Sequence, residues 1–102
     1  MVYGRLTPPP DSPTPDPGQP PWVTDCAYYA GKARTAIGDT GRRVRQVQCI
    51  LLKRGYEIGG TGVDGVFGEG LEAAMMQFQT DKGIAVNGIV KRPTWAILRA
   101  PE

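Results

Sequence analysis

Few side chains in this 102-residue chain are suited to catalysis. The chain has no histidine and a single serine, Ser12, which lies in a proline-rich stretch. Ser–His and Cys–His nucleophiles and the usual zinc ligands of hydrolases are therefore missing. A carboxylate pair such as Glu69 and Glu72 could in principle cleave a glycoside. These two, however, lie at the start of an expected helix, where acidic residues favour the helix dipole. We expect no catalytic activity and no cofactor.

The two cysteines, Cys26 and Cys49, are expected to form a disulfide. Cys49 lies beside the apolar stripe of an expected helix, on an edge shared with Leu52 that needs cover. Residues 22–37 are the segment that could cover this edge, and a bond to Cys26 would hold them there. Closing this loop would contribute about 3 kcal/mol and would imply an oxidising compartment. Two cysteines without histidine do not predict a metal site.

Two short sequences share one pattern and supply the remaining candidate residues. VDGVFG at residues 63–68 is echoed by VNGIVK at residues 86–91. In each copy, a residue that tolerates the left-handed conformation precedes a glycine, which predicts a tight turn leading into a helix. The predicted ligand-binding residues lie at these turns: Asp64, Gly65, Gly68, Asn87, Gly88, Lys91, Arg92 and Thr94.

Each candidate also has a purely structural interpretation. The glycines either offer backbone amides to a ligand or only allow a positive φ. The turn Asp and Asn side chains either bind a ligand or cap their own turns. Lys91 and Arg92 either pair with ligand carboxylates or are solvated surface charges. The aromatic residues Phe67, Phe78 and Trp95 could stack on sugars, but so small a domain needs them in its core.

The elements expected to position these residues are helices. Three are predicted, over residues 41–54, 69–82 and 93–99. In the first, Val44, Val47 and Leu51 recur at the spacing of one buried face. Glycine follows each of the first two helices, and Pro93 suits the first turn of the third. The expected fold is all-α, a small three-helix bundle.

The N-terminal third of the chain differs in composition from the rest. Eight of the ten prolines lie between Pro8 and Pro21, which predicts an extended polyproline II spacer. We therefore expect residues 1–37 to form a proline-rich arm, with a short helix at residues 24–37. Residues 38–102 are expected to form the domain.

Charge and hydropathy exclude two classes of partner. The net charge of +2 is too weak to predict nucleic-acid binding, although residues 38–101, with nine basic and six acidic groups, carry +3. No stretch approaches the ~20 apolar residues that span a bilayer. Neither nucleic acid nor membrane is an expected partner.

The motifs occur in a recognisable order. They are VRQVQ at residues 44–48, Gly55-Tyr56, DGVFG at residues 64–68, Phe78-Gln79, Val86-Asn87-Gly88 and Thr94-Trp95. Over residues 38–100 this series resembles the peptidoglycan-binding domain that accompanies cell-wall hydrolases and phage endolysins. The resemblance implies a three-helix fold and noncovalent attachment to bacterial peptidoglycan, without catalysis in the module.

The sequence departs from that family pattern at three places. Asn87 replaces the usual Asp of the second turn, and Leu71 stands where Thr is common. Lys91 and Arg92 replace a glycine and a small residue, which adds charge to the rim of the expected ligand groove.

Two functions are compatible with this sequence. The first is noncovalent binding to peptidoglycan, which would target a hydrolase or a phage particle to the extracellular cell wall. The alternative is a structural or assembly protein, for example a virion component, that uses the same fold to contact proteins. In that case a partner protein could hold the segment from Met1 to Pro21.

Overall fold

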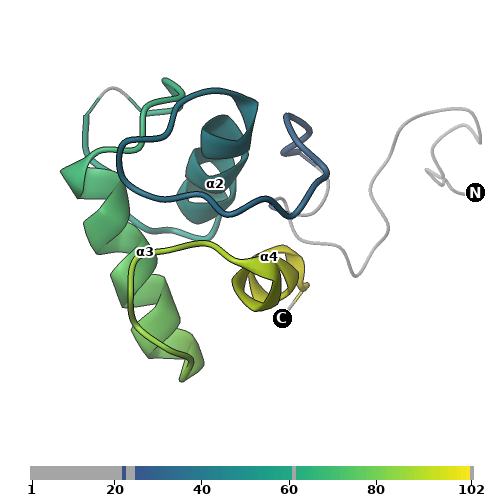
Figure 1. The fold of residues 1–102 in the computed structure, drawn as a ribbon, viewed down its shortest axis with the longest axis vertical. Coiled ribbons are helices and arrows are strands. Elements are labelled where there is room, and N and C mark those ends of the chain that lie inside the picture. The colour runs from purple at the N-terminus through teal and green to yellow at the C-terminus, as the bar shows by residue number, and fades with distance from the viewer. Residues whose placement is uncertain (1–21, 23–24, 61, 102) are drawn as a thin grey trace, which may run out of the picture.

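The computed structural model describes residues 22, 25–60 and 62–101. They form three helices, α2 (Arg42–Lys53), α3 (Glu69–Lys82) and α4 (Arg92–Arg99). Within these residues the only β-pairing is two isolated bridges. The predicted all-α fold is confirmed, and helix ends differ from the predicted ones by at most one residue. In Figure 1, α2 and α4 lie on the same side of α3.

The core forms where α2 meets the other two helices. Val44, Val47 and Leu51 of α2 are completely buried, as their spacing predicted. They share one hydrophobic cluster with Phe78 of α3 and Trp95 of α4. The interpretation of the three aromatic residues as core residues is therefore confirmed, since none of them is more than 1% exposed.

The helix predicted over residues 24–37 is wrong for residues 25–37, which contain no helix. Several backbone groups of this segment bond to distant parts of the domain. The N–H groups of Tyr28 and Tyr29 donate to the Gln46 side-chain oxygen at 2.7 and 3.0 Å. Thr35 exchanges two backbone hydrogen bonds with Val90. The segment thus packs onto the domain, whereas Thr24 and the proline-rich stretch lie outside the described residues.

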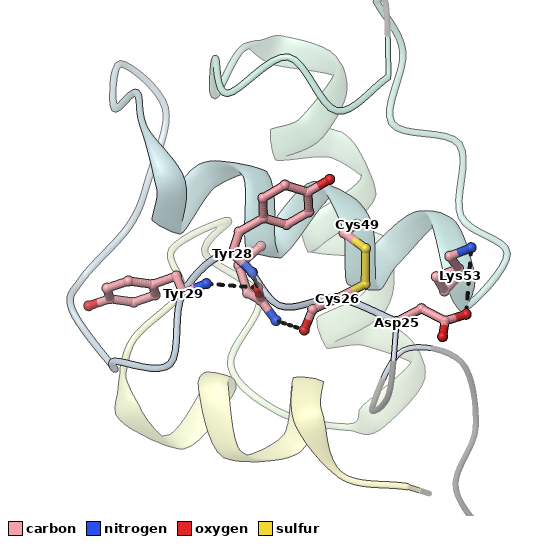
Figure 2. Close-up of a disulfide and its surroundings, with 7 residues drawn as sticks. Asp25, Cys26, Tyr28, Tyr29, Cys49 and Lys53 are labelled. Atoms are coloured by element: carbon pink, nitrogen blue, oxygen red, sulfur yellow. Dashed lines mark hydrogen bonds and ion pairs between the residues drawn. A yellow bond between two sulfur atoms is a disulfide. The ribbon is translucent and has the colours of Figure 1, made fainter. Parts of the chain in front are cut away.

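The predicted disulfide between Cys26 and Cys49 is confirmed. It joins the N-terminal segment to the middle of α2 (Figure 2). Each cysteine is only 7% exposed, and both belong to the core cluster. The bond therefore covers α2 at Cys49, whereas Leu52 on the same edge stays 42% exposed.

A short loop before α2 connects the N-terminal segment to both repeated turns. Thr35 forms a bridge with Val90 in the second turn region, and Thr40 forms one with Val66 in the first. Asp39 stabilises the loop because its carboxylate accepts the Ala36 N–H at 2.8 Å. This hydrogen bond, reinforced by Arg43, holds the pKa of Asp39 below its ordinary value.

No helix among the described residues has the length and apolar character required to cross a bilayer.

Removing the disulfide should destabilise the domain without changing its helices. The bond closes a loop between residues 23 apart in sequence, and the loss of this closure corresponds to about 3 kcal/mol. We expect the double variant Cys26→Ala/Cys49→Ala to melt more than about 10 °C lower by circular dichroism. Reductant should lower the Tm of the native chain similarly and leave the variant unchanged. A native Tm that is insensitive to reductant would contradict the prediction.

Candidate functional site

The first repeated turn is held by a glutamine of α2. The Gln48 side-chain oxygen accepts the Gly65 N–H at 2.8 Å, and its nitrogen donates to Asp64 Oδ1 at 2.7 Å. Asp64 Oδ1 also accepts the N–H of Val66 at 3.0 Å. Gly65 has φ 81°, a conformation that glycine adopts without strain.

The second turn repeats this arrangement with a glutamine of α3. The Gln79 side-chain oxygen accepts the N–H groups of Asn87 and Gly88 at 3.0 and 2.9 Å. Its nitrogen donates to Asn87 Oδ1 and to the Ile89 carbonyl, both at 3.1 Å. Asn87 Oδ1 in turn accepts the Ile89 N–H at 2.9 Å. Asn and Asp therefore serve the same purpose at the two turns.

These bonds give the turn residues a structural role. Asp64 and Asn87 do cap their own turns, and the amides of Gly65 and Gly88 bond to buried glutamines inside the protein. A ligand at the turns would therefore meet side chains and neighbouring loops rather than these two amides.

Gln48 and Gln79 hold the two turns, but they were not among the site residues predicted from the sequence. They are 3% and 0% exposed. The signal was present in the sequence, because each follows a buried apolar residue in its helix and each precedes one copy of the repeated turn. A buried glutamine amide needs partners, and a tight turn offers both donors and acceptors.

Five of the eight predicted ligand-binding residues line two separate hollows, whereas Gly65, Gly88 and Arg92 line neither of them. Asp64 and Gly68 line the first, of about 210 Å³, which we call the first-turn pocket. Asn87, Lys91 and Thr94 line the second, of about 240 Å³, which we call the second-turn pocket. The structure therefore does not gather these residues into one pocket.

The two pockets differ in charge because the helix that follows each turn begins differently. The first-turn pocket includes Glu69, and the first turn of α3 is acidic. The second-turn pocket includes Lys91, the N-cap of α4, and the exposed Arg92 follows it. The first turn of α4 has no acidic residue. An anionic group is thus favoured at the second-turn pocket, both by these cations and by the positive end of the α4 dipole.

Among the described residues, no three His, Cys, Asp or Glu side chains gather closely enough to hold a metal ion.

Comparison with known proteins gives a family and several relatives. The family described as "Putative peptidoglycan binding domain" matches residues 40–98. An uncharacterised protein in the bpoA1 3′ region of Kitasatospora aureofaciens is 42% identical over 71 residues. That match covers 70% of this chain and 59% of the relative. The chain therefore spans about three fifths of the length of this relative.

Solved structures share the fold. The SleB N-terminal domain matches with a TM-score of 0.65 and 31% identity, covering 72% of this chain and 100% of that domain. A peptidoglycan-binding protein from Clostridioides difficile matches with a TM-score of 0.60 and 30% identity, over 66% of this chain and 40% of that one. A fused Zn-dependent amidase/peptidase/peptidoglycan-binding domain-containing protein from Clostridium acetobutylicum matches with a TM-score of 0.62 and 30% identity, over 69% of this chain and 30% of that one.

The turn-binding role of Gln79 can be tested by removing its amide. In Gln79→Leu, the buried N–H of Gly88 and its neighbours lose their partner, so the free energy of unfolding should fall by about 2 kcal/mol or more. Gln77→Leu is the matched control: Gln77 is exposed on the same helix, and its loss should cost less than about 0.5 kcal/mol. Urea denaturation measures both. Equal effects would show that the amide of Gln79 does not hold the second turn.

Proposed function

This chain belongs to the peptidoglycan-binding domain family, and on that premise we propose that it attaches noncovalently to bacterial peptidoglycan through the second-turn pocket. The wall polymer carries stem peptides with carboxylates, which are suitable ligands for a cationic pocket at a helix N-terminus. Asn87, Lys91, Arg92 and Thr94 are the residues we assign to this contact. In this proposal the other turn, with Asp64 and Gly68 at its pocket, has mainly a structural role.

The observation that carries the proposal is the difference between two otherwise equivalent turns. Each turn is held by a buried glutamine and capped by its own Asp or Asn side chain. Only the second turn is followed by two cations, Lys91 and Arg92. Helix formation does not require cations at this position, because α3 begins after Gly68 without them. Lys91 lines the pocket itself.

The wider role we propose is targeting. In the Clostridium acetobutylicum relative, a peptidoglycan-binding domain is fused to a Zn-dependent amidase/peptidase. By analogy, this chain would hold a hydrolase or a phage particle at the extracellular face of the wall and would add no catalysis of its own. The expectation that a partner protein holds residues 1–21 concerns a part of the chain outside the described residues.

The proposal predicts that the full chain co-sediments with purified peptidoglycan sacculi. Arg92→Glu should raise the apparent Kd about fivefold, the effect of losing one exposed ion pair, and should leave the helical circular dichroism unchanged. Binding should also weaken as salt is raised, because exposed charges are screened. If the chain stays in the supernatant at low salt while an established wall binder pellets, the binding proposal fails, and assembly through protein contacts becomes the function to test.

The matched control is Arg42→Glu. Arg42 is exposed at the first residue of α2, as Arg92 is at the first residue of α4. Arg54 would be a poor control, because its guanidinium donates to the carbonyls of Ile97, Leu98 and Ala100 at the end of α4. Equal loss of binding in Arg92→Glu and Arg42→Glu would mean that overall charge drives attachment.

A further inference from the structure

The segment that covers α2 presents an aromatic ring to solvent. Tyr28 is 43% exposed, whereas the ring of its neighbour Tyr29 packs on Trp95 with 5.6 Å between ring centroids. Figure 2 shows the two tyrosine side chains pointing in different directions, with the Tyr28 ring on the side of Cys49. Burial therefore explains the position of Tyr29 and leaves that of Tyr28 unexplained.

The backbone that carries Tyr28 is firmly held. The Cys26–Cys49 disulfide lies two residues before it, and Gln46 accepts the N–H groups of both tyrosines. Arg99 donates to the Tyr29 carbonyl at 2.8 Å. Because the backbone is held in this way, only the side-chain rotation of Tyr28 is lost when it binds a ligand, which is a general advantage of preorganised sites.

Tyr28 lines two hollows in the surface. The first, of about 560 Å³, is also lined by Trp22, Tyr29 and Arg99, and we call it the Arg99 hollow. The second, of about 430 Å³, is also lined by Asp25, Leu52 and Lys53, and we call it the Lys53 hollow. Each has a volume in the range of small-ligand sites, and Tyr28 is common to both.

We propose that Tyr28 and the two hollows beside it bind the glycan strand of peptidoglycan, as a site additional to the second-turn pocket. This inference rests on the proposed function, since it takes the wall as the ligand. Tyr28 and most residues of the Arg99 hollow lie outside residues 40–98, the part that matches the family, whereas Leu52 and Lys53 of the other hollow lie within it.

The chemistry of the hollows fits a sugar polymer. Aromatic rings such as that of Tyr28 offer a flat apolar face with a polar tip, which complements the C–H face and the hydroxyl rim of a pyranose. At the Lys53 hollow, the Asp25 and Lys53 side chains lie 3.9 Å apart and provide an acceptor and a donor for hydroxyl and acetamide groups.

Hydrogen-bond complementarity favours the same occupant at the other hollow. Arg99 is the cationic side chain of the Arg99 hollow. Muramic acid, every second sugar of the strand, bears a lactyl group whose carbonyl accepts hydrogen bonds and which is a carboxylate once the stem peptide is removed. We assign this group to Arg99 and the neutral N-acetylglucosamine to the Lys53 hollow, so that the strand crosses Tyr28.

The test uses soluble glycan strands from which an amidase has removed the stem peptides, titrated into the full chain by calorimetry. The native chain should bind them, and Tyr28→Ala should bind about tenfold more weakly, as expected for loss of one stacked ring. Tyr28→Phe keeps the ring and should stay within about threefold of the native chain. Ile37→Ala is the matched control, since Ile37 is 46% exposed on the same segment and lines neither hollow.

Three results would overturn the inference: no binding of stripped strands by the native chain, native-like binding by Tyr28→Ala, or an equal loss in Ile37→Ala. Sedimentation with intact sacculi separates this failure from failure of the proposed function. If sacculi bind in an Arg92-dependent way while stripped strands do not, the glycan site is wrong and the second-turn site stands. If stripped strands bind through Tyr28 while Arg92→Glu has no effect on sedimentation with sacculi, the second-turn site is wrong and the glycan site stands.

Discussion

The structure depends on three buried glutamine side chains that satisfy the backbone of loops. Gln46, Gln48 and Gln79 are at most 4% exposed, and each bonds to backbone groups of a segment that has no sheet to pair with. Gln46 holds the N-terminal segment, and the other two hold the repeated turns. In a domain with three helices and long connections, unpaired backbone groups would be the main cost of burying loops. The glutamine amides remove that cost by offering a donor and an acceptor together.

This constraint shapes what the turns can do. Because the amides of Gly65 and Gly88 are bonded inward, the turns are rigid supports, and recognition passes to the side chains around them. A Cβ at Gly88 would lie 2.9 Å from Glu72 Cγ, so the second turn also packs tightly on α3. The two copies differ where the following helix begins, at Gly68-Glu69 in one and Lys91-Arg92 in the other. The charge difference between the two pockets arises there.

The N-terminal segment is also held by a buried glutamine, together with other contacts to α2 and α4. It is joined to α2 by the disulfide and by Gln46, and to α4 by Arg99 and by Trp95, whose indole N–H donates to the Ala33 carbonyl. The segment thus closes over two helices at once and creates hollows that the three helices alone would not form. A separate domain beginning at residue 38 would lack the covalent bond and much of the cover over the α2 edge.

The sequence by itself determined the helices, the core and the disulfide. Apolar spacing such as that of Val44, Val47 and Leu51 is a local property, glycine and proline mark helix ends locally, and two cysteines allow only one intramolecular pairing. The order of motifs was likewise sufficient for the family. The conformation of residues 25–37 was decided only by tertiary structure, because their hydrogen-bond partners are Gln46 and Val90, which are distant in sequence. The separation of the predicted ligand-binding residues into two pockets and the exposure of Tyr28 were decided in the same way, since both depend on which surfaces the helices bring together.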